Sequence, residues 1–192
     1  MGARCSAAAK PFVKNNRPAH NTGSVSNSCR IPLATGWDVG LIASGSGNPN
    51  IGPIATSSNG KANTPLGDGS LTWDQPGDQQ PDKYSYDPRD PVMSVMDIDA
   101  QAMPRNQAVL DGRRDVLVYQ TAPFKQELRL IGPVTVKLWA ASDAVDTDFT
   151  AKLVIVYEDG IAVNLTYGIM RAQYREGYDT PSLIAPGEPY EY

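Results

Sequence analysis

The stretch that decides the fold covers residues 134–157 and reads VTVKLWAASDAVDTDFTAKLVIVY. Its first part places Val134, Val136, Leu138 and Ala140 at alternate positions, separated by Thr135, Lys137 and Trp139. Alternation with a period of two puts one set of side chains on a single face of an extended strand. This part therefore predicts a β-strand with one buried face.

A second alternation runs through residues 149–157, with Phe149, Ala151, Leu153, Ile155 and Tyr157 on one face. The opposite face begins polar, with Thr150 and Lys152, and ends apolar. Because Val154 and Val156 then lie opposite Leu153 and Ile155, both faces are apolar there. We predict a longer strand whose far end is covered on both sides.

Similar strands lie on either side of this stretch. Glu158-Asp159-Gly160 is a hairpin-type turn, after which residues 161–165 and 169–175 are expected to form two strands. Upstream, β-rich runs at 116–121 and 126–131 predict two more. The chain holds 17 Gly and 16 Pro and shows no convincing amphipathic helix of ten residues, which favours an antiparallel, all-β sandwich or barrel.

The first part of the chain has a different character. Residues 1–53 are rich in Asn, Gly, Ser and Pro and predict a poorly ordered tail or linker, because little apolar surface offsets the entropy of ordering. Residues 54–91 are dense in turns, with one short strand at most. The folded domain is therefore expected at 54–192, and a strand is expected to start at Tyr190, so that the sandwich lacks its last strands and keeps an open edge.

Composition excludes several classes of protein. A net charge of −4 with no Lys/Arg cluster argues against a nucleic-acid partner. No apolar run is long enough for a membrane span and no signal peptide is evident, so a cytoplasmic protein is expected. Gly2 and Ser6 fit the loose myristoylation pattern. Cys5 and Cys29 are too few for a disulfide framework and are expected to be free thiols or a single pair.

Motifs for catalysis and for metal binding are missing. The only histidine, His20, lies in the expected tail, and there is no G-x-S-x-G motif, so a Ser-His-Asp triad is not expected. Cys5, His20 and Cys29 lack the spacing of a zinc site. We expect no cofactor and no metal.

An acidic cluster, Asp143, Asp146 and Asp148, is the most suggestive polar feature. Counted from Asp143, the positions that an EF-hand requires as glycine and glutamate hold Asp148 and Val154, so the calcium motif fails. The favoured interpretation is a turn whose carboxylates accept backbone N–H bonds. Arg171 and Arg175 are expected on a solvated strand face, although ion pairs or a partner domain are alternatives.

Three runs together resemble a known family: DGRRDVLVYQTAPF from Asp111, GPVTVKLWAASDAVDTDFTAKLVIVYEDGIAVNLTYGIMRAQYREG from Gly132, and YSYDPRDPV from Tyr84. They are similar to the C-terminal, non-catalytic domain of the cocaine esterase and Xaa-Pro dipeptidyl-peptidase family of serine hydrolases. The resemblance covers roughly residues 54–192. It implies a jelly-roll-like, galactose-binding-like β-sandwich.

The resemblance also implies a division of labour. In the family, an α/β-hydrolase domain carries the triad and acts on esters, amides or Xaa-Pro peptides, so that domain is the expected partner. A loop beyond the Asp-Pro segment approaches the substrate pocket in these enzymes. Ala100, Gln101 and Met103 are the equivalent substrate-contact candidates, although Met96-Asp97 stands where the family often has two glycines.

Two other functions stay open. Jelly rolls also serve as free-standing carbohydrate-binding or ligand-binding modules, for which Trp73 and Trp139 are candidate aromatic platforms, although Trp139 is expected to pack between the layers. The chain could equally be a fragment or a truncated, non-functional product. An open sheet edge would also permit a homo-oligomer.

Overall fold

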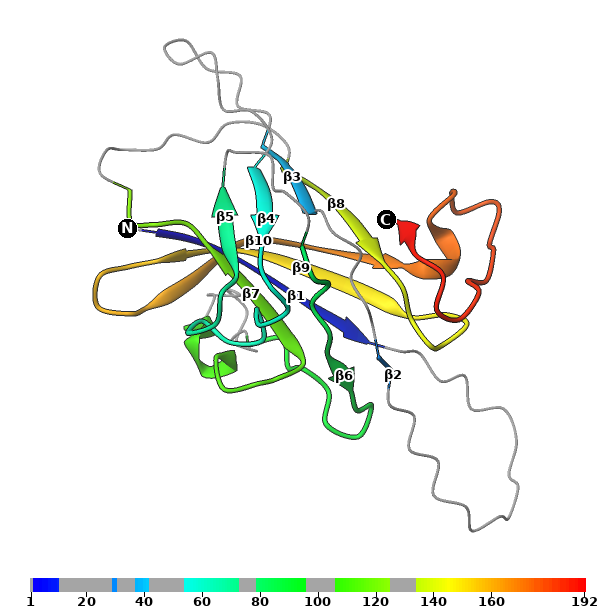
Figure 1. Cartoon of the computed structure of the whole chain (residues 1–192), viewed down its shortest axis with the longest axis horizontal. Helices are drawn as coiled ribbons and strands as arrows, with labels where there is room; N and C mark the ends of the chain where they lie inside the picture. The colour runs from blue at the N-terminus through cyan, green and yellow to red at the C-terminus, as the bar shows by residue number, and fades with distance from the viewer. Residues whose placement is uncertain are drawn as a thin grey trace, which may run out of the picture.

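The computed structural model describes residues 2–10, 29–30, 37–41, 54–72, 79–95, 106–124 and 134–192. Within these ranges the regular structure is almost entirely β, with two short 3-10 helices, so the expected all-β class is confirmed (Figure 1). No helix in the described ranges has the length and apolar character that crossing a membrane requires. The strands are β1 Gly2–Lys10, β2 Cys29–Arg30, β3 Trp37–Leu41, β4 Ile54–Ser57, β5 Ser70–Thr72, β6 Ser85–Tyr86, β7 Val116–Gln120, β8 Val134–Ala140, β9 Asp148–Val156, β10 Ala162–Arg171 and β11 Tyr190–Glu191; the 3-10 helices are η1 Gln107–Leu110 and η2 Ala172–Tyr174.

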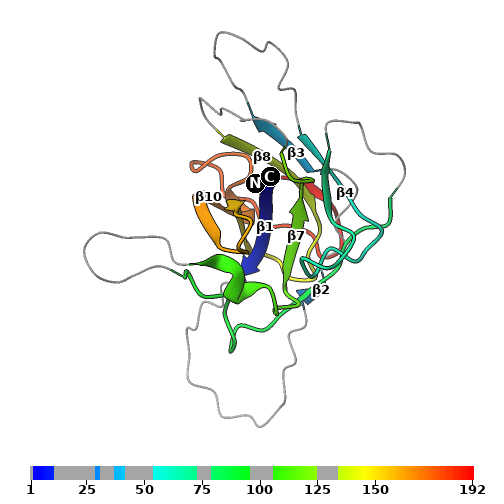
Figure 2. The same ribbon diagram turned by 90° about the vertical axis from the view of Figure 1, so that its left-hand side faces the viewer.

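Nine of the strands form one sheet in the order β10-β9-β1-β7-β5-β4-β3-β8-β11, and β2 pairs with β6. The sheet curls, so that β8 lies across the interior from β9 and β10 (Figure 2). Buried side chains from both sides meet in one core, which includes Leu117, Tyr119, Leu138, Phe149 and Leu153. A smaller cluster of Val92, Leu110, Val116 and Val118 lies on the other face of β7.

The alternation that decides the fold is present in β8 and β9. Leu138 and Ala140 are 5% and 0% exposed, while Thr135 and Lys137 face solvent. In β9, Leu153 and Val154 are both buried, so the strand is covered on two sides there, whereas Ile155 and Val156 at its far end are only half-buried.

Trp139 was expected between the layers, and that expectation is wrong. Its side chain is 42% exposed, because the strand period assigns it to the face opposite Leu138 and Ala140.

The turn after β9 is confirmed, but the strand that follows differs from the prediction. Gly160, at φ 83°, donates its N–H to the Tyr157 carbonyl and closes the hairpin. One strand, β10, then replaces the two expected strands. A register shift between Asn164 and Thr166 keeps β10 paired with β9 along its length, and the chain turns into η2 at Ala172.

The structure assigns strands to three stretches of residues 1–53, where the sequence predicted a poorly ordered tail. They are β1, β2 and β3, and β1 pairs on both sides, with β7 and β9. Residues 54–91 hold three short strands instead of one. The expected strands at 116–121 and from Tyr190 are present as β7 and β11, and the one expected at 126–131 lies outside the described residues.

A buried carboxylate joins β7 to the turns that precede it. Asp82 is 3% exposed and accepts hydrogen bonds from the Tyr119 hydroxyl at 2.7 Å, the Ala62 N–H at 2.9 Å and the Ser58 hydroxyl. The three donors offset the cost of desolvating the carboxylate, and they hold the segment around Ala62 against β7. Sequence reasoning did not single out Asp82.

Replacing Asp82 with Ala is expected to lower the free energy of unfolding by about 2–4 kcal/mol, because three buried donors lose a shared acceptor. Urea unfolding followed by intrinsic fluorescence measures the change. Glu158→Ala, in the exposed hairpin, is the control and is expected to stay within about 0.5 kcal/mol. Equal stability of the two variants would contradict this role.

Candidate functional site

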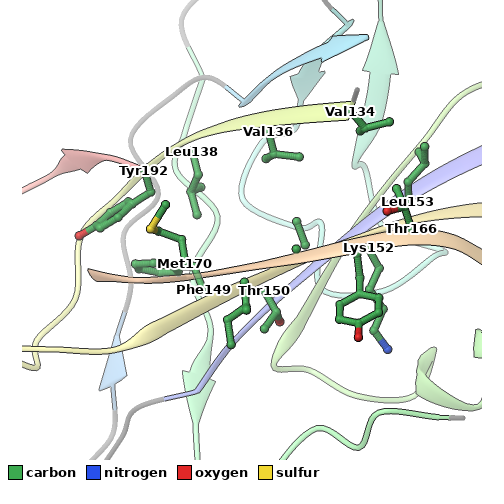
Figure 3. A pocket seen from close by; sticks show the side chains of 14 residues that line it. Val134, Val136, Leu138, Phe149, Thr150, Lys152, Leu153, Thr166, Met170 and Tyr192 are labelled. Atoms are coloured by element: carbon green, nitrogen blue, oxygen red, sulfur yellow. The ribbon is translucent and has the colours of Figure 1, made fainter. Parts of the chain in front are cut away.

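A largely apolar cavity of about 230 Å³ lies between β8 and the β9–β10 pair. Val134, Val136 and Leu138 extend into it from β8 (Figure 3). Phe149 and Leu153 of β9 and Met170 of β10 face them, and Tyr192 lies at one end. Thr150 and Lys152 project from the other side of the strand pair, and Lys152 donates to Gln107 Oε1 at 2.9 Å.

Two small residues lie side by side on the neighbouring strands β9 and β10, on the side of the cavity opposite β8. Gly168 of β10 is in register with Ala151 of β9, between the larger pairs Met170–Phe149 and Thr166–Leu153. A Cβ added at Gly168 would meet no atom within 4 Å. Gly168 and the nearby Thr166 are exposed, so the hollow is open to solvent at this pair, while β9 and β10 stay hydrogen-bonded around it.

Tyr192 closes one end of the cavity. Its ring lies 4.6 Å from that of Phe149, and its backbone exchanges hydrogen bonds with Leu138 at 2.8 and 3.0 Å. Burial raises the pKa of its hydroxyl to about 12, and among the described residues that hydroxyl has no hydrogen-bond partner. Tyr192 therefore acts here as an apolar ring.

This lining can hold an apolar group by burial, but it offers no nucleophile paired with a base. At about 230 Å³ the cavity is smaller than the roughly 300–1,000 Å³ of sites for drug-sized ligands. It suits a small apolar group or a single side chain of a partner. No cluster of three metal-binding side chains occurs in the ranges that the structure covers.

The three candidate acids lie around the start of β9. Asp146 accepts from Arg171 Nε at 3.0 Å and from the Gln173 N–H at 3.1 Å, and Asp148 lies 3.7 Å from the same Nε. These contacts tie the turn before β9 to the end of β10 and to η2. Asp143 is exposed. Ala100, Gln101 and Met103 lie outside the described residues.

The two arginines differ from the expected solvated face. Arg171 pairs with the acids described above, and the Arg175 side chain is only 7% exposed. Arg175 Nη1 donates to the carbonyls of Ser182 at 2.5 Å and Ala172 at 3.1 Å, and its guanidinium lies 4.4 Å from the centre of the Tyr190 ring. It therefore holds the loop before β11 against η2.

Comparison with known proteins agrees with a non-catalytic site. Residues 50–192 match the family described as the X-Pro dipeptidyl-peptidase C-terminal non-catalytic domain. The chain is 41% identical over 143 residues to the cocaine esterase of Rhodococcus sp. (strain MB1 Bresler), and this match covers 72% of the chain and 25% of that relative. The matched region thus spans about a quarter of the relative's length.

Replacing the glycine in the middle of β10 should stabilise the fold. Gly168→Ala is expected to raise the free energy of unfolding by about 0.5–1 kcal/mol, because Gly168 is exposed with open space at its Cβ, and alanine favours the strand and stiffens the unfolded chain. Gly112→Ala, which also meets no atom within 4 Å but lies in a turn outside the cavity, is the matched control and should gain less. Denaturant unfolding measures both, and destabilisation by Gly168→Ala would show that this space is not empty.

Stability should fall at high pH through Tyr192. Burial raises the pKa of Tyr192 to about 12, so the folded state favours the neutral phenol. The stabilisation of the fold by neutral Tyr192 is therefore complete below pH 10 and is lost as the pH rises from 10 toward 12. Tyr192→Phe should keep the ring contact and lessen the fall in melting temperature over that range. Tyr178→Phe, whose ring is 79% exposed, should leave the wild-type profile unchanged. If the melting temperature fell with pH to the same extent in the wild type and in both variants, Tyr192 would not be the group that lowers stability at high pH.

Proposed function

Because the chain belongs to the family of X-Pro dipeptidyl-peptidase C-terminal non-catalytic domains, we propose that it serves as an accessory β-sandwich domain of a serine hydrolase. The observation that carries the proposal is the match of residues 50–192 to that family. A cavity lined mostly by apolar side chains supports it, since a catalytic site would need a nucleophile and a base within hydrogen-bond reach. The sandwich would be of the jelly-roll, galactose-binding-like type.

The partner in this proposal is an α/β-hydrolase domain that carries the Ser-His-Asp triad. The relative is about four times as long as the matched region, which leaves room for such a domain. Its reaction would be acyl transfer to water through a serine ester, with esters, amides or Xaa-Pro peptides as substrates. Ala100, Gln101 and Met103 remain proposed contacts to that substrate.

One surface suits such a partner. Leu165, Tyr167 and Ile169 of β10 are 53%, 61% and 59% exposed, and alternate along one strand. Single exposed apolar side chains are common, but a contiguous row on a strand marks a surface that a partner covers. From Ala162 to Met170, β10 carries no charged residue to discourage contact along this row. We assign this row to the interface with the catalytic domain.

A free-standing carbohydrate-binding module is the second candidate. The observation that favours it is the 42% exposure of Trp139, since an exposed aromatic ring can stack on a sugar. Trp73, the other candidate ring, lies outside the described residues. A glycan-binding screen that compares the wild type with Trp139→Ala separates this function from the first.

The purified chain is expected to hydrolyse p-nitrophenyl acetate no faster than a heat-denatured control, because the triad would reside in another domain. The release of p-nitrophenol at 400 nm measures the rate. Turnover that a serine-directed inhibitor abolishes would contradict the proposal.

A chimera tests the accessory role directly. Residues 50–192 would replace the matched segment of the Rhodococcus esterase, and the product is expected to fold and hydrolyse the same ester. The pair Tyr167→Ser and Ile169→Ser should lower its melting temperature and activity. Met93→Ser, at an apolar residue elsewhere that is 71% exposed, is the control and should change neither. Equal effects of the two changes would rule out the β10 row as the interface.

A further inference from the structure

One buried glutamine joins three separate parts of the chain. Gln107, the first residue of η1, is only 6% exposed. Its Nε2 donates to the Val95 carbonyl at 3.0 Å, and its Oε1 accepts from Lys152 Nζ of β9 at 2.9 Å. The side-chain amide of Gln107 therefore connects the chain at Val95, the helix η1 and the sheet.

The chemistry of this bridge favours a glutamine. A lysine ammonium offers N–H donors and no acceptor, whereas a backbone carbonyl is an acceptor only. The amide of Gln107 serves both, while a glutamate would place a carboxylate against the Val95 carbonyl. Because Gln107 is buried, losing these two partners is costly. The bridge is therefore a specific contact between Val95 and Lys152.

The neighbouring Asn106 fixes the same helix to the sheet by a second route. Its Oδ1 accepts from the Ala108 N–H at 3.0 Å, which caps η1, and from the Ala162 N–H at 2.9 Å, at the start of β10. Leu110 of η1 belongs to the smaller buried cluster, and Val95 packs against that cluster. Polar and apolar contacts thus hold η1 and Val95 at one place on the sheet.

These contacts lie at the two ends of the stretch 96–105. Val95 precedes that stretch and Gln107 lies just beyond it, so one side chain ties its two ends together. Fixing both ends limits how far the residues between them can reach. All three proposed contacts to the substrate lie between these fixed points: Ala100, Gln101 and Met103.

The bridge lies on the face of the sheet that carries the apolar row of β10. Lys152 is in register with Tyr167, and Thr150 with Ile169, and residues directly opposite on paired strands have their side chains on the same face. Gln107 contacts Lys152 and therefore lies beside that row. One face of the β9–β10 pair thus holds both the proposed interface with the catalytic domain and the Gln107 bridge.

We propose that Gln107 is a positioning residue of the hydrolase: by joining Val95 to Lys152, it holds the two ends of the stretch 96–105 on the face that meets the catalytic domain. The inference rests on the proposed accessory function and deepens it, since it names the contact that places the substrate-facing residues. Gln107 acts through that stretch and not by touching the substrate, because its amide is engaged by Val95 and Lys152.

Hydrogen exchange on the full chain tests the bridge itself. Gln107→Met keeps the length of the side chain but removes both hydrogen bonds, so η1 should loosen from the sheet. The amides of Ala108, Asp111 and Ala162 are expected to exchange at least ten-fold faster than in the wild type. The amide of Leu138 in β8 is the internal reference and should not change. Unchanged exchange at all four amides would overturn the proposal.

Kinetics of the chimera described above separate positioning from stability. Gln79→Met is the matched control, because Gln79 also bridges two groups: it donates to the Thr56 carbonyl and accepts from the Ser58 N–H, beside β4. Both substitutions should lower the melting temperature. Gln107→Met alone is expected to raise KM for the ester, by at least five-fold, with kcat within two-fold, because binding contacts are displaced while the triad is intact.

The outcomes distinguish this inference from the accessory function. Equal KM values for Gln107→Met and Gln79→Met in an active chimera would overturn the role of Gln107 and leave the accessory function standing. An unmodified chimera without esterase activity would instead contradict the accessory function. The exchange of the Ala162 amide in the full chain would then still decide whether Gln107 fixes η1 to the sheet.

Discussion

The packing of β7 against β9 and β8 across one apolar interior is the constraint on which the rest of the structure depends. Leu117 and Tyr119 of β7, Phe149 and Leu153 of β9, and Leu138 of β8 belong to the same buried cluster. Each fully buried side chain of this kind contributes roughly 1.5–3 kcal/mol, so five of them outweigh any single polar contact. The sheet must curl to bring these strands together. The hydrogen bonds of Asp82 tie the segment around Ala62 to β7, and the contacts of Arg175 tie the loop before β11 to η2.

The same constraint explains the character of the candidate site. A curled sheet encloses only the side chains that its inner face provides, and between β8 and β10 that face is apolar. The opposed pair Ala151 and Gly168 leaves part of the interior unfilled. The molecule therefore presents an apolar hollow and an apolar row on β10. The proposed contact with a catalytic domain rests on these two features and on the family match.

Prediction from sequence succeeded where the pattern is local. The strands β7, β8 and β9 and the turn at Gly160 follow from alternation and turn residues within a few positions. β10 was predicted as two strands, at 161–165 and 169–175, yet the ladder with β9 continues through residues 166–168. Trp139 was expected between the layers, although its position in the strand alternates with Leu138 and Ala140 and so places it on the opposite face. The candidates Ala100, Gln101 and Met103 stay predictions, since they lie outside the described residues.

By itself, the sequence determined the all-β class, the strands with clear alternation, the family and the lack of a recognisable triad motif, since each of these depends on residue types at short spacing. Only the tertiary structure decided that Asp82 meets Tyr119, that Ala151 and Gly168 leave a cavity, and that Gly2–Lys10 lies between β7 and β9. Those arrangements join residues far apart in the chain, and strand pairing is set by backbone hydrogen bonds that every residue except proline can make. A segment of small residues thus carries no local signal of the strands with which it pairs.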